Sequence, residues 1–198
     1  MPAPERGPRE RLISSAAQLI RRDGVGATGM RDVAEHAKAP RGSLQHYFPG
    51  GKEQLVNEAV AFAGRYTARK VVYHLAALGE QERTPSGLLA ALMRQWTEEL
   101  NATDFTLGCT LAAVTVDCAE SSASTRKAAA AAFAEWLTPV RSALEELGVP
   151  APRASRLATL VISSLEGALL MARAERSLRA FDEVCAELGP LLDAAVAP

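Results

Sequence analysis

The sequence has few of the residues that build catalytic centres, metal sites or disulfide frameworks. It holds three cysteines and three histidines in 198 residues. Cys109 and Cys118 are nine residues apart, which is not the spacing of a zinc site, and Cys185 is isolated. An odd number of cysteines behind an N-terminus without an apolar leader favours reduced thiols. Because glycine-rich phosphate loops, nucleophile elbows and His-Glu metal motifs are also missing, we expect no enzyme, no metal and no other cofactor.

Long apolar runs and strand-like alternation are missing as well. No stretch approaches 18 consecutive apolar residues, and the first ten residues lack the apolar core of a signal peptide. These absences predict a cytoplasmic protein without a membrane span. The segments between the Gly and Pro breaks are rich in Ala, Leu, Glu and Arg, which are strong helix formers, and none alternates with period two. The sequence therefore predicts an all-α fold.

The net charge of −1 hides an asymmetry along the chain. Residues 1–52 carry nine Lys and Arg against five Asp and Glu, a net charge of +4, and the remainder carries 13 against 18, a net charge of −5. A basic segment joined to an acidic one is typical of a polyanion-binding module on a body that does not bind. Chance variation of surface charge explains the same numbers, so the charge alone leaves both interpretations open.

The N-terminal part of the chain is expected to form a helix-turn-helix unit. Proline at the first helical position and an apolar i, i+3/4 stripe predict a first helix over Pro8–Arg22. A short second helix is expected after Thr28, which we expect to be its N-cap, and a third over Pro40–Tyr47. A long fourth helix is expected over Lys52–Ala77. In such a unit the second of the two short helices enters the major groove of DNA.

Five further helices are expected in the rest of the chain. Between the remaining Gly and Pro breaks we place them at Ser86–Asn101, Cys109–Ala119, Ser124–Leu147, Pro152–Arg176 and Phe181–Ala195. We expect Pro139 and Pro190 to kink or interrupt their helices. The helix over residues 153–176 is apolar on more than one side and must be buried on most sides. Burial against a second subunit and burial as a central core helix both satisfy this pattern.

Residues 26–55 carry a specific family resemblance. They contain Asp32-Val33-Ala34, Arg41-Gly42-Ser43-Leu44, His46-Tyr47-Phe48 and Lys52-Glu53-Gln54-Leu55. These runs resemble the DNA-binding domain of the TetR family of transcriptional repressors, and the match covers about residues 8–60. The Phe48–Lys52 and Leu107–Asp117 runs resemble the LmrA/YxaF-like subgroup, whose members respond to antibiotics and flavonoid-like aromatics.

The resemblance implies a homodimer that binds an inverted-repeat operator in double-stranded DNA. Each subunit would have a three-helix head, residues 1–52, on an effector-binding and dimerisation body of about six helices, residues 53–198. In this family the last two long helices form the dimer interface, and a small effector moves helix four and releases the operator. The subgroup implies an apolar or aromatic effector. A helical small-molecule-binding protein and an adaptor gated by a protein partner, both without operator function, remain as alternatives.

Three residues depart from the family pattern. Lys38 stands where the turn of the helix-turn-helix usually has Gly. Pro40 occupies a usual Ser or Thr position, and Gln45 replaces a usual Tyr. These departures affect which operator sequence is read more than whether DNA is bound. Glutamine can pair with adenine N6 and N7 in the major groove, or with phosphate if it faces the DNA backbone.

The resemblance places the DNA contacts on the two short helices and at the start of helix four. Arg41 would contact guanine or phosphate, and Lys52 would hold a phosphate beside free backbone N–H groups. Arg6 and Arg9 form either a minor-groove arm or a disordered tail. Core or solvent-exposed positions are the alternative for each candidate. The full set is Thr28, Arg31, Pro40, Arg41, Gly42, Ser43, Gln45, His46, Tyr47 and Lys52.

The body offers weaker candidates. Aromatic residues make up only 5% of the chain, so those in the body are candidates for stacking on a flat ligand or for filling the core. Two acids inside apolar helices would be polar points in a pocket or face solvent. The pocket candidates are Phe62, Tyr66, Trp96, Phe105, Asp117, Phe133, Trp136 and Glu166. The candidates for the dimer interface are Leu160, Ser164, Gly167, Ala168 and Met171.

Overall fold

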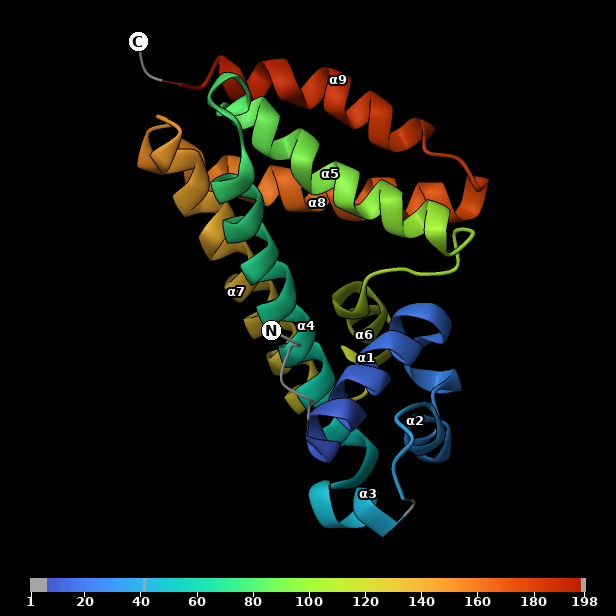
Figure 1. Ribbon diagram of the computed structural model, residues 1–198. Coiled ribbons are helices and arrows are strands. Elements are labelled where there is room, and N and C mark those ends of the chain that lie inside the picture. Colours follow the sequence, from blue (N-terminus) through green and yellow to red (C-terminus); the bar gives the residue numbers. More distant parts are fainter. Residues whose placement is uncertain (1–6, 41, 197–198) are drawn as a thin grey trace. The chain divides into compact units, whose positions relative to one another are not determined.

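The computed structural model describes residues 7–40 and 42–196 (Figure 1). These residues form nine α-helices and one 3₁₀ turn, η1 (Glu80–Glu82), without a strand, so the predicted all-α fold is confirmed. The helices are α1 Pro8–Ala27, α2 Met30–His36, α3 Gly42–Tyr47, α4 Gly51–Ala77, α5 Pro85–Ala102, α6 Thr110–Cys118, α7 Ala123–Glu146, α8 Ala151–Glu175 and α9 Arg179–Asp193.

The junction between α1 and α2 differs from the sequence prediction. Helix α1 breaks at Gly24, where φ is +84° and ψ is 170°, and then adds one more turn, which the sequence prediction missed. Thr28 directly follows this turn, so its hydroxyl donates to the carbonyl of Gly24, four residues back, at 2.7 Å. The expectation that Thr28 caps α2 was wrong. Gly29 is the N-cap, and its N–H donates to the Asp32 carboxylate at 3.1 Å.

The two internal prolines do not interrupt their helices. Helix α7 runs through Pro139 and α9 runs through Pro190. Helix α3 begins two residues later than predicted, because Pro40 precedes it as part of the turn and accepts the Ser43 N–H at 3.0 Å. The remaining helix ends lie within two residues of the sequence prediction at either end.

The chain divides into two compact units that do not follow chain order. The first unit consists of the described part of Met1–Gly64 with Cys109–Phe133. The second consists of Arg65–Gly108 with the described part of Ala134–Pro198. Helices α4 and α7 each contribute to both units. Helix α6, which the sequence assigns to the body, therefore packs with the N-terminal helices.

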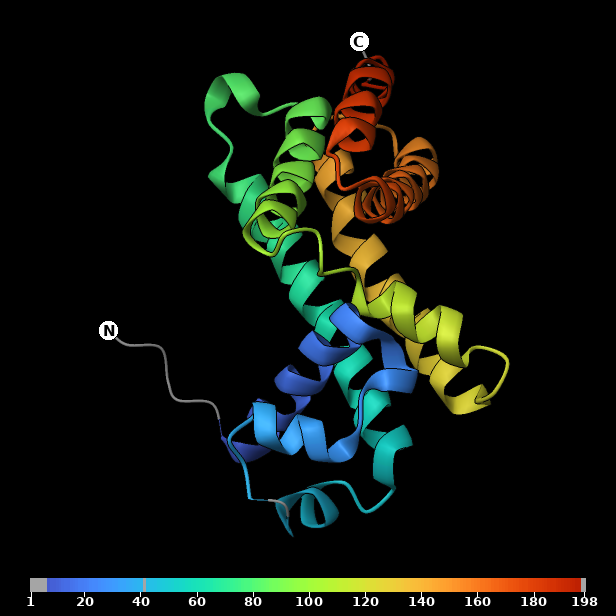
Figure 2. The ribbon, with the colours of Figure 1, turned by 90° about the vertical axis from the view of Figure 1, so that its right-hand side faces the viewer.

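In the first unit, hydrogen bonds join both ends of α6 to α1. At its start, the buried Thr110 hydroxyl donates to the carbonyl of Ala17 at 3.1 Å. At its end, the carboxylate of Asp117 accepts the N–H of Val25 at 2.6 Å. The two helices lie side by side in Figures 1 and 2. The core beneath them includes Leu12, Ile20, Phe48, Val60 and Leu111, each at most 1% exposed.

In the second unit α9 packs against α5 and α8. The rings of Trp96 and Trp136 lie 6.4 Å apart at 34°, and both side chains are buried. Gly189 places α9 close to α5, since a Cβ there would lie 3.5 Å from the Ser86 Cβ. The Asp193 carboxylate then accepts the Ser86 N–H at 2.9 Å, which satisfies one free donor at the start of α5.

By length and composition, α8 would be able to cross a membrane. Less than half of its most apolar window is buried within the subunit. A single helix of this kind is weak evidence for a membrane span, because core helices of soluble proteins have the same length and composition. The exposed apolar residues of α8 therefore need another account, which is given below.

Candidate nucleic-acid interface

Helices α2 and α3 are joined by a tight, specifically capped turn. At the end of α2 the N–H of Ala39 donates to the carbonyl of Ala34 at 2.9 Å, and the N–H of Lys38 donates to that of Glu35 at 3.0 Å. This pair of bonds is a Schellman motif, which requires a left-handed residue just after the helix. Lys38 supplies it, with φ of +50°. The motif ends α2 and sets the direction in which the chain leaves toward α3.

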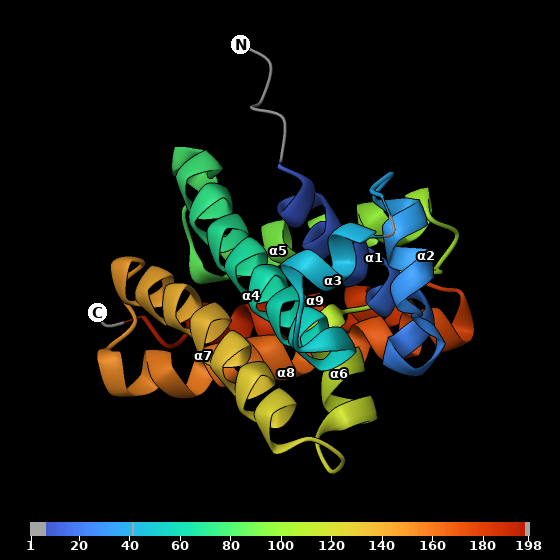
Figure 3. The same cartoon turned by 90° about the horizontal axis from the view of Figure 1, so that it is seen from below.

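The exposed side of α3 faces away from the core of the first unit. Leu44 is buried beneath α3, whereas Gly42, Gln45 and His46 are exposed. Helix α3 lies at one end of this unit in Figures 1 and 2, and Figure 3 looks onto it. A short helix supported on an apolar core, with its polar side chains exposed, has the geometry that enters a major groove.

The sequence-predicted DNA contacts differ in how far their side chains are exposed. Arg31, Pro40, Gly42, Gln45 and His46 are exposed. Ser43, Tyr47 and Lys52 are half-buried, and the ring of Tyr47 meets that of His46 edge-on at 4.9 Å. Thr28 is buried, with its hydroxyl bonded to Gly24. Arg41 lies outside the described residues.

The start of α4 is held beside this face. Gly51 takes a φ of +67°, and its N–H donates to the carbonyl of Phe48 at 2.9 Å. The Gln54 side chain accepts the Gly50 N–H at 2.9 Å. Lys52 follows as the second residue of α4, where the backbone N–H groups of the first helical turn favour anions.

Arg9 belongs to neither a minor-groove arm nor a disordered tail. It lies in the first turn of α1, where its guanidinium pairs with the Glu58 carboxylate at 2.6 Å. The same guanidinium lies 5.6 Å from the centre of the Phe48 ring. Arg9 therefore joins α1 to α4 and to the end of the helix-turn-helix. Arg6 lies outside the described residues.

The pocket candidates are divided between the two units. Phe62, Phe133 and Asp117 belong to the first unit, where Asp117 is exposed and bonded to Val25. Of those in the second unit, Trp96 and Trp136 pack against one another with tilted rings, and the carboxylate oxygens of Glu166 are shielded from solvent. Tyr66 and Phe105 are half-buried there. The sequence did not predict the hydrogen bond between Asp117 and α1, because it shows only that an acidic residue lies inside an apolar helix.

Known proteins share the sequence features and the fold of this chain. Residues 12–59 match the family model described as bacterial regulatory proteins, tetR family. Residues 85–187, more than half of the chain, match the C-terminal domain of LmrA/YxaF-like transcriptional regulators. The chain belongs to the TetR family. It is therefore a helix-turn-helix transcriptional regulator from a family without enzymatic activity, as the sequence predicted.

Relatives of this TetR-family regulator cover nearly its whole length. The uncharacterized HTH-type transcriptional regulator Rv0196 of Mycobacterium tuberculosis is 42% identical over 191 residues, 94% of each chain. The HTH-type transcriptional regulator LmrA of Bacillus subtilis is 28% identical over 163 residues, 82% of this chain and 85% of LmrA. The crystal structure of a regulatory protein TetR from Rhodobacter sphaeroides has the same fold, with a TM-score of 0.80 and 19% sequence identity. The match covers 92% of this chain and 97% of the Rhodobacter chain.

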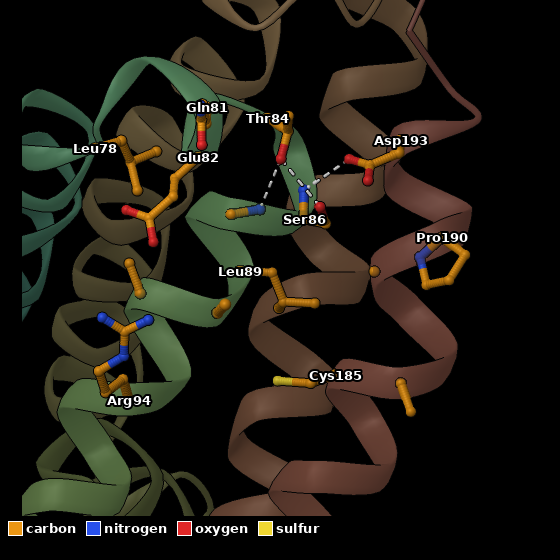
Figure 4. A pocket seen from close by; sticks show the side chains of 15 residues that line it. Leu78, Gln81, Glu82, Thr84, Ser86, Leu89, Arg94, Cys185, Pro190 and Asp193 are labelled. Carbon is orange, nitrogen blue, oxygen red and sulfur yellow. Dashed lines mark hydrogen bonds between the residues drawn. The ribbon is translucent and has the colours of Figure 1, made fainter.

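A groove lies between α5 and α9 of this regulator (Figure 4). Its volume is about 840 Å³, and Leu78, Gln81 and Glu82 close one side. None of the sequence-predicted pocket residues lines it. The hydrogen bond from the Ser86 N–H to Asp193 spans its upper part, and Arg94 and Glu82 bring opposite charges to its wall.

Two of the three thiols of the regulator have a raised pKa. Burial, followed by the negative charge of Asp182, raises the pKa of Cys185, which lines the groove. Burial and then Asp117 raise the pKa of Cys118. A raised thiol pKa keeps the sulfur protonated at neutral pH and lowers its reactivity. Within residues 7–40 and 42–196, no group of three or more His, Cys, Asp or Glu side chains is arranged to hold a metal.

Proposed function

We propose that this TetR-family regulator represses transcription by binding an inverted-repeat operator as a homodimer, and that a small apolar or aromatic effector releases it. The observation that carries the proposal is the exposed polar face of α3. Gln45 and His46 are exposed on this face, and Leu44 and Phe48 are buried beneath it. The amide of Gln45 has the donor and acceptor that pair with adenine N6 and N7. Arg31 on α2 and Lys52 at the start of α4 add positive charges that suit DNA phosphates.

We expect Lys52→Ala to weaken binding to all duplexes and to reduce the slope of log K against log salt by about one for each subunit of the homodimer. Lys52 lies at the start of a helix whose N–H groups favour a phosphate, and that contact carries no sequence information. Fluorescence anisotropy of a selected duplex at several salt concentrations measures both effects. Lys127→Ala, on the exposed surface of α7, is the matched loss of one charge and should leave the slope unchanged.

The homodimer is supported by an uncovered apolar face on α8. Leu160 and Met171 are 41% and 45% exposed, although both are large and apolar. Ser164 and Gly167 lie between them at helical spacing, so the four residues form one stripe along α8. Ala168 is 2% exposed and packs within its own subunit. Small residues between large apolar ones allow a second copy of α8 to approach closely.

We expect Gly167→Arg to convert the dimer into monomers at micromolar concentration. A Cβ at Gly167 meets no atom within 4 Å in the single subunit, so the substitution should leave the fold intact. The arginine would instead place a charge at the centre of the interface. Sedimentation analysis measures the mass, and Ala130→Arg on the exposed side of α7 is the control. A dimeric Gly167→Arg protein would place the interface elsewhere.

We also propose a functional division between the head, residues 1–52, and the body, residues 53–198, and a cytoplasmic location. The body would hold the effector among the aromatic candidates of the second unit. The LmrA/YxaF-like match over residues 85–187 supports an effector site in this part of the chain. A library of aromatic compounds, screened for loss of operator anisotropy, tests this assignment.

A further inference from the structure

Lys38 is held in a backbone conformation that glycine adopts without strain. It is the left-handed residue of the Schellman motif after α2, with φ of +50°. An L-residue with a Cβ is strained there, and glycine is the common choice at this position of the motif. A strained residue persists only where the surroundings, or a function, compensate for it.

The other non-glycine residues with positive φ are compensated within the molecule. Asp104 and Arg176 both have positive φ, and their side chains form an ion pair with each other. Phe105 has positive φ, but its ring is half-buried and its N–H donates to the Leu100 carbonyl at 2.8 Å. Strain in these residues therefore comes with contacts that hold their conformation.

Lys38 has no such compensation from its side chain. The residue is exposed, and among the residues that the structure describes its ammonium has no ion pair or hydrogen bond. Its neighbours Ala37 and Ala39 carry no charge. The backbone bonds of the motif would form equally well with glycine, so nothing within the subunit explains a lysine here.

Lys38 lies close in sequence to the proposed DNA-binding face of α3. It lies in the turn that connects α2 to α3, four residues before α3 begins. The side chains of Gln45 and His46 on that helix form the exposed face proposed to enter the major groove. A protein that docks such a helix brings the preceding turn close to the sugar-phosphate backbone that borders the groove.

We propose that Lys38 is a further DNA contact, whose ammonium pairs with a backbone phosphate at the edge of each half-site. This inference rests on the proposed operator binding. The phosphate contact compensates in the complex for strain that remains uncompensated in the free protein. Lysine suits this role because a flexible point charge reaches a phosphate without a fixed geometry. The contact adds affinity and fixes the placement of α3, but it reads no base.

The test compares Lys38→Gly, Lys38→Arg and the parent protein as full-length chains. Lys38→Gly removes the strain and the charge together, so its urea midpoint should rise while its operator affinity falls. Each lost phosphate contact changes the salt slope by about 0.9, so the two contacts of a homodimer correspond to about 1.8, or roughly a sixtyfold loss of affinity at 0.1 M salt. Lys38→Arg should keep both the affinity and the slope. Lys127→Gln, on the exposed surface of α7, is the control for charge alone.

If Lys38 had only a structural role, Lys38→Gly would give different unfolding and binding results. If Lys38→Gly is more stable and binds the selected duplex with the parent's affinity and slope, the inference is overturned. It is equally overturned if the variant loses binding because its urea midpoint falls. Failure of the proposed function is recognised separately, because the parent itself would then show no sequence-specific, salt-dependent binding, and that result overturns both proposals.

Discussion

Gly24→Ala should lower the free energy of unfolding by about 2–4 kcal/mol, because two independent constraints meet at this residue. The first is conformational, since a φ of +84° with a ψ of 170° belongs to a region that is essentially restricted to glycine. The second is steric, since a Cβ there would lie 2.9 Å from the Asp117 carboxylate oxygen. That oxygen also accepts the Val25 N–H at 2.6 Å, so the methyl group would disturb the bond between α6 and α1.

Gly26→Ala is a matched control for Gly24→Ala. Gly26 lies in the same short turn, is exposed and would meet no atom within 4 Å of a new Cβ. Its substitution should change stability by no more than about 0.5 kcal/mol. Urea unfolding of the full-length proteins measures the difference. Equal midpoints for the two variants would mean that the close approach of Asp117 to Gly24 is not part of the folded protein.

The substitution Trp136→Ala should lower the free energy of unfolding by about 3–5 kcal/mol. Trp136 is 2% exposed and belongs to the largest fully buried side chains of the described residues. Its ring packs against that of Trp96 at 6.4 Å, so truncation leaves a large cavity beside a second aromatic ring. Thermal or urea unfolding monitored by circular dichroism measures the loss independently of tryptophan emission.

Tyr73→Ala is the control for the loss of an aromatic ring, because Tyr73 is 63% exposed and its removal should change stability by no more than about 0.5 kcal/mol. The same experiment separates the two interpretations of Trp136 that the sequence left open. A folded Trp136→Ala protein with the parent's unfolding midpoint, but without any response to an effector, would place this ring in the effector pocket. The loss of stability expected here would assign this ring to the core and leave the effector to the other aromatic candidates of the second unit.

Local chemistry made much of the helical framework predictable. Pro8 at the start of α1 and Pro85 at the start of α5 fit the first helical turn, which does not need a proline N–H. The glycine break at Gly24 was visible in the sequence, but the extra turn behind it was not. That turn depends on Asp117, which is 92 residues away along the chain and supplies an acceptor for the Val25 N–H. Thr28 was consequently assigned to the wrong helix end.

The exposed side of the helix-turn-helix was easier to predict than the packing of the aromatic residues in the body, for a physical reason. The helix-turn-helix is built from contiguous residues, so Leu44 and Phe48 reveal its buried side and Gln45 its exposed side. The aromatic candidates of the body come from three helices, from the turn after α5 and from two units, and only long-range packing decides which of them meet. Single-sequence patterns report the face that a residue occupies on its own helix, and they do not report its neighbours across the core.

Selection of bound duplexes from a random DNA library, followed by anisotropy at two salt concentrations, tests the central claim most directly. The protein is first denatured, freed of small molecules and refolded, so that a retained effector does not mask binding. We predict an inverted repeat with half-sites roughly 34–36 Å apart, or a multiple of that spacing. We predict a Kd of about 10⁻⁸ M or tighter that weakens steeply with salt. Weak binding without sequence preference would contradict the assignment of this chain as an operator-binding repressor.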